Sequence, residues 1–257
     1  NSQATMSEAH ALGFGYASGG GVYTLGGLVS LYSTLSNNVA LVEGSTPSFG
    51  GGAFARGASL MLGSTVSGNQ AWRMGGAAFA DNTGLSTSIV NSTVSGNFAD
   101  TIGGVFGRGP LNIYNSTIAF NAESFFEPYG AGLFVFNTNV ELESTIVSNN
   151  YNVYTGSNVE DDVATSTNYS GTLSGSHNLI KLSSMTVPPD TIENKYANLG
   201  PLTYNGGTTA THKLMTFSPA INAGSNAGSL NYDQRGAGYP RVIGSNADIG
   251  AFELNTA

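Results

Sequence analysis

Cysteine is absent from this chain of 257 residues, which excludes a disulfide scaffold and a thiolate metal site. Charged residues make up only 9% of the sequence, whereas a soluble domain usually has roughly 25%. This scarcity excludes a charged helical bundle, whose exposed faces need Glu and Lys. Hydrophobic residues nevertheless reach 40%, with 13 Phe and 12 Tyr, so we expect a packed core rather than a disordered chain.

Positive charge is especially scarce, since 8 Lys and Arg face 16 Asp and Glu and give a net charge of −8. Binding to nucleic acid needs a basic patch, so the sequence predicts no nucleic acid partner. It contains no run of ~18 apolar residues, so it also predicts no membrane span. No basic and apolar leader stands at Asn1, as expected of a mature protein after signal removal. A mature form of this kind fits an exported protein.

Glycine, by contrast, is abundant, with 36 residues, and an internal repeat contains much of it. A Ser-Thr-apolar phrase recurs at steps of 31, 28, 24 and 28 residues, beginning at Ser33, Ser64, Ser92, Ser116 and Ser144. A glycine-rich phrase with an aromatic residue precedes each one, the aromatics being Tyr23, Phe54, Phe79, Phe106 and Phe134. Two landmarks at a fixed phase, without a helical stripe, predict an all-β, right-handed parallel β-helix with coils of about 28 residues.

The asparagine five positions after each repeat serine is expected to stack on its counterparts in neighbouring coils. Asn side chains can hydrogen-bond along a stack, and Asn tolerates the left-handed backbone of a sharp corner. The predicted ladder consists of Asn38, Asn69, Asn97, Asn121 and Asn149. We expect the repeat aromatics to form a second column inside the coils.

The repeat phrases resemble those of pectin-lyase-like parallel β-helices and of chlamydial polymorphic outer-membrane proteins. Further phrases lie at 198–202, 205–212, 218–224, 233–236, 240–241 and 247–253. They resemble the choice-of-anchor Q domain of bacterial exported proteins. That resemblance implies export and often surface attachment, and it implies no known reaction.

A single domain is expected, with β-helix coils over 1–185 and a continuous coil and capping region over 186–257. The second region concentrates charge in an otherwise uncharged protein. We expect its acidic and arginine side chains to form a hydrogen-bonded network that seals the last coil, namely Asp233, Arg235, Arg241, Asp248 and Glu253.

Cleavage of a polysaccharide needs suitably placed carboxyl groups, and the candidates for catalysis are Glu141, Glu143 and Asp161. The acidic run at 160–162 is expected to be a solvated loop, and His177 a turn residue. No metal motif is present, so the sequence predicts no metal and no cofactor. A Ca²⁺ ion on the carboxylates stays open without a motif to support it.

Six aromatic residues fall in the variable segments of the coils, which emerge on one flank of a solenoid: Trp72, Phe125, Phe126, Tyr129, Tyr151 and Tyr154. Such rings either stack on a sugar or a protein partner, or cover the core. They are the ligand-binding candidates.

These observations predict a structural, adhesive or glycan-binding role, with a polysaccharide or a surface or matrix component as the partner. Self-assembly is a variant, because exposed β edges and low charge favour end-to-end homo-oligomers. The alternative is a polysaccharide lyase or glycoside hydrolase that acts in a groove along the β-helix. A phage-like or effector module is a third hypothesis.

Overall fold

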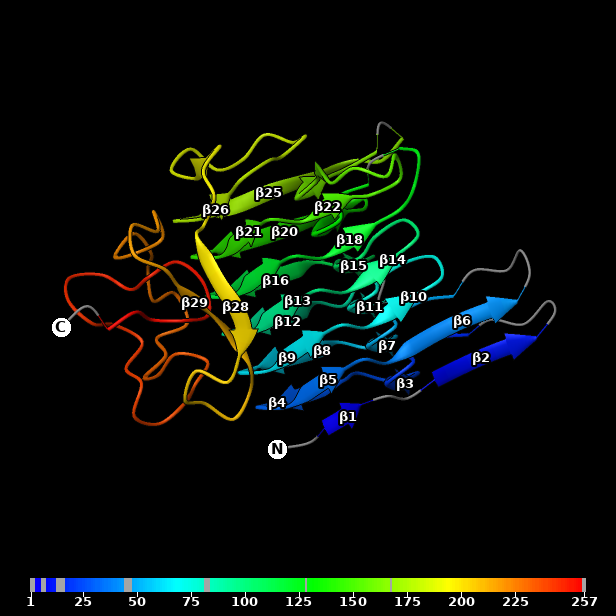
Figure 1. Ribbon diagram of the computed structural model, residues 1–257, viewed down its shortest axis with the longest axis horizontal. Coiled ribbons are helices and arrows are strands. Elements are labelled where there is room, and N and C mark those ends of the chain that lie inside the picture. Colours follow the sequence, from blue (N-terminus) through cyan, green and yellow to red (C-terminus); the bar gives the residue numbers. More distant parts are fainter. Residues whose placement is uncertain are drawn as a thin grey trace.

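The computed structural model describes residues 3–5, 8–12, 17–43, 48–80, 84–127, 129–166 and 168–255. These ranges contain β-strands and no helix. Short strands from successive coils stack in parallel along one axis (Figure 1). The chain therefore forms a parallel β-helix, as the repeat predicts.

Each complete coil contributes one strand to each of four sheets. The first sheet contains, in stacking order, β1 (Gln3–Thr5), β5 (Thr34–Ser36), β9 (Thr65–Ser67), β13 (Thr93–Ser95), β17 (Thr117–Ala119), β21 (Ile146–Ser148), β26 (Leu179–Ile180) and β27 (Ile192–Glu193). The second contains β2 (Glu8–Leu12), β6 (Val39–Glu43), β10 (Gln70–Ala71), β14 (Phe98–Ala99), β18 (Ala122–Glu123), β22 (Tyr151–Asn152) and the antiparallel β23 (Val159–Glu160).

The third and fourth sheets complete the coils. The third contains β3 (Val22–Thr24), β7 (Ala53–Ala55), β11 (Ala78–Ala80), β15 (Val105–Gly107), β19 (Leu133–Val135) and β24 (Val163–Ala164). The fourth contains β4 (Val29–Leu31), β8 (Ser59–Leu62), β12 (Thr87–Val90), β16 (Leu111–Tyr114), β20 (Thr138–Glu143) and β25 (Gly171–Ser176). An antiparallel hairpin, β28 (Leu199–Thr203) and β29 (Thr211–Leu214), follows the coils.

The register superimposes equivalent repeat residues, so that Val66 pairs with Val94 and Val94 with Ile118. Side chains alternate along each strand, and one face of every sheet points into the coils. Medium-sized apolar residues fill this interior, including Leu35, Val66, Ile89, Val94, Ile113, Ile118, Leu142, Val147 and Ile180. The repeat thus provides the core as well as the backbone pairing.

The repeat aromatics do not form the interior column that the sequence suggested. Phe54, Phe106 and Phe134 are buried in a cluster separate from the main core. Their strand neighbours Ala53, Val105 and Leu133 belong to the main core, so the rings lie on the outer face of the third sheet. Residues outside those strands cover them, namely Phe49, Met74, Tyr129 and Phe136. Tyr23 is largely exposed, and the side chain of Phe79 lies outside the described residues.

The asparagine ladder is present, with one change of residue. Successive Nδ2–Oδ1 hydrogen bonds of 2.8–2.9 Å join Asn38, Asn69, Asn97, Asn121 and Asn150. Asn149 was the wrong choice for the last step, because the register pairs Thr117 with Ile146 and so aligns Ser116 with Thr145. Asn149 instead occupies the corner before the ladder, with a φ of 63°.

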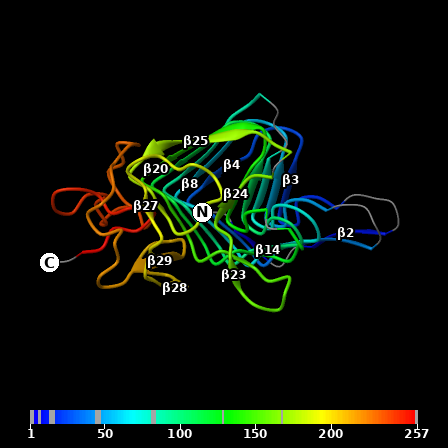
Figure 2. The ribbon, with the colours of Figure 1, turned by 90° about the horizontal axis from the view of Figure 1, so that it is seen from above.

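The C-terminal region packs along the side of the first sheet (Figures 1 and 2). Gln234 Nε2 donates to Thr65 Oγ1 at 2.9 Å, and Thr93 Oγ1 donates to Gln234 Oε1 at 2.6 Å. Thr117 Oγ1 accepts from Ala251 N at 3.1 Å. The expectation that this region seals the last coil is therefore wrong, because outward threonines of three repeat phrases hold it across several coils. Met185 and Val187 pack against the main core instead.

Candidate functional site

The ligand-binding candidates are brought together only in part. Phe125 lies 4.7 Å from Phe126 and 5.6 Å from Tyr129, measured between ring centroids. Tyr129 in turn meets the buried ring of Phe134 edge-on at 5.3 Å. The ring of Phe126 is 61% exposed. A chain of ring contacts therefore supports an exposed ring on the outside of the coils.

The remaining candidates lie along the same flank of the second sheet. Trp72, Ser124 and Val153 occupy equivalent positions in their coils. Ser124 lies two coils after Trp72, and Val153 lies one coil after Ser124. Trp72 and Tyr154 are both exposed, whereas Tyr151 is half-buried. Neighbouring coils are about 4.8 Å apart, so Trp72 lies roughly 10 Å along the axis from the Phe125 level. We call the six residues Trp72, Phe125, Phe126, Tyr129, Tyr151 and Tyr154 the aromatic flank.

Glu141 and Glu143, two of the predicted catalytic candidates, lie on the outer face of β20. Tyr114 donates its hydroxyl proton to Glu141 Oε2 at 2.8 Å. Burial, followed by this hydrogen bond, raises the pKa of Tyr114 to about 12. Glu143 Oε1 accepts from Ser176 Oγ at 2.7 Å and from Ser225 Oγ at 2.8 Å. The two carboxylates are therefore held in place, and Glu141 is open to solvent.

His177 stands beside this pair. Its Nδ1 lies 3.7 Å from Glu143 Oε1 and 3.6 Å from Asp190 Oδ2. Its φ of 54° agrees with its predicted place in a turn. The outer face of the last coils thus gathers groups that can accept and donate protons.

Asp161, the third catalytic candidate, does not join Glu141 and Glu143. It is buried, and its Oδ2 accepts from Gly130 N at 2.8 Å and from Ala131 N at 3.1 Å. The prediction of a solvated acidic loop at 160–162 is wrong, because backbone amides bind the carboxylates of Asp161 and Asp162, and Lys181 pairs with Glu160 at 2.8 Å. Asp162 ends the asparagine ladder, accepting from Asn150 Nδ2 at 2.8 Å.

Asp161 has a partner that the sequence did not indicate. Glu123 is fully buried, and its Oε1 accepts from Tyr129 N and Asn152 Nδ2, both at 2.9 Å. Burial, followed by the charge of Asp161, raises the pKa of Glu123 to about 10. Glu123 Oε2 has no hydrogen-bond partner, and the raised pKa keeps the Glu123 carboxyl protonated at neutral pH beside the carboxylate of Asp161. Because both carboxyl groups are enclosed, this pair serves the fold rather than a substrate.

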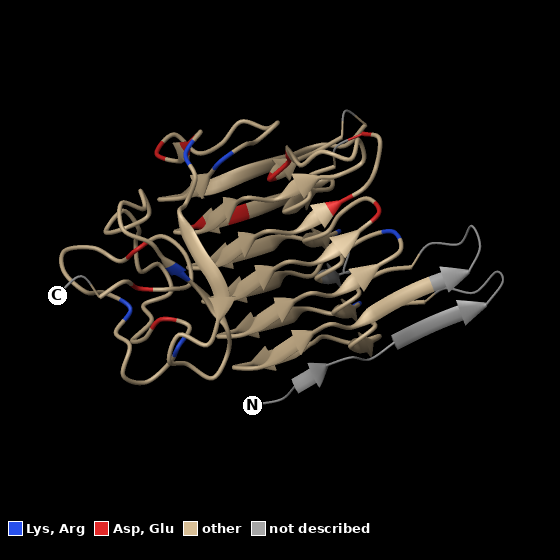
Figure 3. Ribbon diagram, viewed as in Figure 1, with Lys and Arg blue, Asp and Glu red and all other residues tan. Residues whose placement is uncertain are grey.

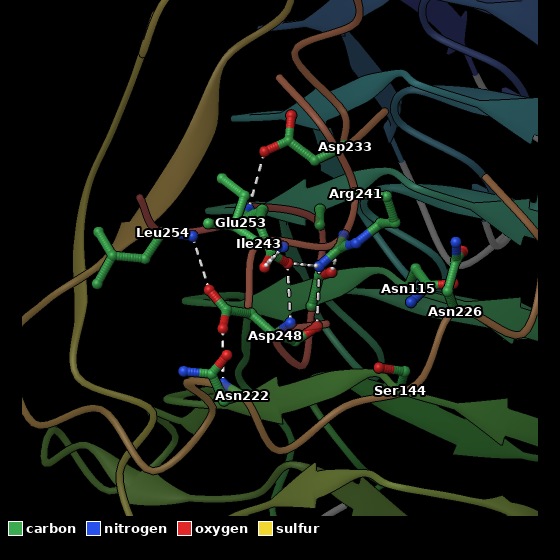
Figure 4. Close-up of polar contacts among 12 residues, drawn as sticks. Asn115, Ser144, Asn222, Asn226, Asp233, Arg241, Ile243, Asp248, Glu253 and Leu254 are labelled. Atoms are coloured by element: carbon green, nitrogen blue, oxygen red, sulfur yellow. Dashed lines mark hydrogen bonds and ion pairs between the residues drawn. The ribbon is translucent and has the colours of Figure 1, made fainter. Parts of the chain in front are cut away.

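The predicted charge network is present in the C-terminal region (Figure 4). Arg241 is fully buried and donates to Glu253 Oε2 at 3.0 Å and to the carbonyl oxygen of Gly250 at 2.8 Å. Arg235 pairs with Asp233 at 2.6 Å. Asp248 Oδ1 and Oδ2 accept from backbone amides of two separate loops. Figure 3 shows that charge gathers here and at the last coils, while the middle coils carry little.

Within the described ranges, no group of three or more His, Asp or Glu side chains is placed to hold a metal ion. The same part of the chain has no helix of the length and hydropathy needed to cross a bilayer. Comparison with models of protein families, with curated proteins and with solved structures finds no match. The parallel β-helix therefore rests on the structure itself, and the resemblance to choice-of-anchor Q domains stays a prediction.

Proposed function

We propose that this protein is a secreted or cell-surface β-helix that binds a glycan or another surface component through its aromatic flank. One observation carries the proposal, namely that Phe126 is largely exposed and is supported by rings that reach the buried Phe134. An ordered exposed ring offers a stacking surface with little loss of side-chain freedom on binding. The exposed rings of Trp72 and Tyr154 extend that surface along the axis, which suits an extended chain. An adhesive or structural role follows from such binding.

Phe126→Ala and Trp72→Ala test the proposal on a glycan array, with titration of the best hit. Each stacked ring contributes about 1 kcal/mol, so each variant is expected to bind roughly fivefold to tenfold more weakly. Phe217→Ala is the matched control, because that ring is 89% exposed in the C-terminal region. Equal losses in all three variants, or full binding by both flank variants, would contradict the proposal.

A polysaccharide lyase or glycoside hydrolase is the second candidate. It is favoured by the position of Glu141 and Glu143 on one outer face, beside His177. Assays for reducing ends and unsaturated products, run on every glycan that binds, decide between the two functions. Turnover that Glu141→Gln or Glu143→Gln abolishes would place the enzyme first, whereas binding without turnover leaves the adhesive role.

A further inference from the structure

A groove separates the C-terminal hairpin from one corner of the coils. Its volume is about 420 Å³, and its walls are Asn37, Ser67, Gly68, Ser95, Gly96, Phe120, Pro201, Leu202 and His212. Four of these occupy the same corner in successive coils, namely Asn37, Gly68, Gly96 and Phe120. All four have a left-handed backbone, with φ between 57° and 65°.

Phe120 is the exception in this column. Asn and Gly adopt positive φ readily, whereas a bulky residue there is strained. The ring of Phe120 is 38% exposed and lies 5.0 Å from the ring of His212, so core burial does not account for it. Strain of this kind is typical of residues that touch ligands. The sequence carried this signal, since the corresponding corners elsewhere have Asn or Gly.

The groove is open beside that ring. A Cβ atom built on Gly96 would meet nothing within 4 Å, so the adjacent corner leaves space in front of Phe120. One coil further, a Cβ on Gly68 would approach Asn37 Oδ1 to 2.5 Å, which places the Asn37 amide at the far side of that space. An aromatic face, a gap and a side-chain amide therefore follow one another along the axis.

The lining carries no formal charge. None of its nine residues is Lys, Arg, Asp or Glu. His212 is buried, with Nδ1 at 2.7 Å from the carbonyl oxygen of Gly200 and Nε2 at 2.8 Å from Ser95 Oγ. Burial lowers the pKa of His212, so the ring is neutral. An anionic ligand would lose its hydration here without gaining a cationic partner.

We propose that this groove binds a neutral sugar ring, stacked on Phe120 and hydrogen-bonded by the side chains of Asn37 and Ser67. Stacking on an aromatic face together with a few polar groups is the ordinary composition of a small-molecule site. Acidic sugars are excluded by the neutral lining. The site shares no residue with the aromatic flank, so the two proposals can be tested independently.

The ring protons of His212 report on this groove in an NMR titration, and those of His177, outside its lining, serve as the internal reference. The probes are hexasaccharides of β-1,4-linked glucose, α-1,4-linked glucose and β-1,4-linked mannose, with an oligogalacturonate as the acidic comparison. We expect a neutral probe to change the chemical shifts of the His212 ring protons in a saturable way. We expect the oligogalacturonate to leave those chemical shifts unchanged.

Phe120→Asn and Gly96→Asn keep a residue that tolerates positive φ, so both variants are expected to fold. The first removes the stacking face and the second fills the gap, and each is expected to weaken binding roughly tenfold. Asn149→Gly, at the same corner but outside the groove, is expected to bind as the unaltered protein does.

Three results would overturn the proposal. The first is that no neutral probe changes the chemical shifts of the His212 ring protons, and the second is that the oligogalacturonate changes them equally. The third is that both variants bind as strongly as the unaltered protein. If the fluorescence of Trp72 responds to a probe while the His212 signals stay still, this site is refuted and the proposed function of the flank survives.

Discussion

Single residues decide how this neutral interior tolerates its few carboxyl groups. Glu123 is protonated because it is enclosed beside Asp161, and Asp162 is held by the last asparagine of the ladder. Burial raises the pKa of Asp162 as well, to about 7. A sequence pattern does not reveal such a pair, since a lone Glu in a variable segment is normally solvated.

The Glu123 pair predicts a dependence of stability on pH. The pKa of Glu123 is about 10 in the folded protein and 4.5 when unperturbed. Its stabilising contribution is thus fully present below pH 4.5 and is lost as the pH rises toward 10, at up to ~1.4 kcal/mol per pH unit. Glu123→Gln replaces the carboxyl group with an amide that does not titrate, so it is expected to flatten this slope and to be the more stable protein at pH 9. Urea unfolding at several pH values measures it.

Glu127→Gln is the control for that experiment, because Glu127 is an exposed neighbour. The two substitutions remove the same ionisable group, a glutamate carboxyl, from the chain. Parallel pH profiles for the two variants would show that Glu123 does not hold its proton.

The ladder gives a second prediction at this scale. Asn97 is buried, and its Oδ1 accepts a hydrogen bond from Asn69 Nδ2 while its Nδ2 donates one to Asn121 Oδ1. Asn97→Ala leaves those partners unsatisfied and is expected to lower the free energy of unfolding by about 3 kcal/mol. Asn149→Gly, at the neighbouring corner position, is expected to change it by less than ~1 kcal/mol. Chemical denaturation measures both free energies of unfolding. A large decrease for Asn149→Gly would contradict the placement of Asn149 outside the asparagine ladder.

At the scale of the element, the repeat predicted the strands and their stacking because each phrase is one coil. The repeat did not reveal which face of the third sheet points into the coils. Apolar side chains occupy both faces of that sheet, so the alternation of side chains along its strands fits either orientation. The placement of the C-terminal region depends on Gln234 and the outward repeat threonines, which are up to 169 residues apart in the chain. No short-range pattern records contacts of that separation.

Gln234 therefore has the largest expected effect on the C-terminal region. It is fully buried and bonds to Thr65, Thr93 and Thr209. Gln234→Ala is expected to cost about 2–3 kcal/mol and to speed amide exchange in β28 and β29 while the middle coils stay protected. Hydrogen-exchange mass spectrometry measures this, with Gln70→Ala on the exposed face of β10 as the control. Uniform deprotection of all coils would contradict a local role.

At the scale of the whole molecule, the N-terminal end of the described coils leaves apolar side chains exposed on an edge strand. In the described ranges the first and second sheets begin with β1 and β2, so β3 and β4 form the first strands of the other two. Val29 and Leu31 on β4 are largely exposed, at 66% and 45%. An exposed apolar edge of this kind is a site for strand pairing.

End-to-end association is the expected consequence of that edge. A double variant with Val29→Lys and Leu31→Lys is expected to sediment as a monomer at concentrations where the unaltered protein forms larger species. Tyr204→Lys, a charge placed on an exposed residue of the C-terminal region, is the control. If the unaltered protein is monomeric at every concentration, self-assembly is ruled out.

The bonds between the C-terminal region and the repeat threonines also bear on the order of folding. In a simple solenoid each coil is stabilised by its neighbours alone, and coils can open one at a time. Here one late segment spans Thr65 to Thr117 and bonds to three coils at once. During synthesis, those coils emerge well over a hundred residues before the segment that fastens them. We therefore expect resistance to proteolysis to be gained in one late step, when the segment around Gln234 and Ala251 closes over coils that have already stacked.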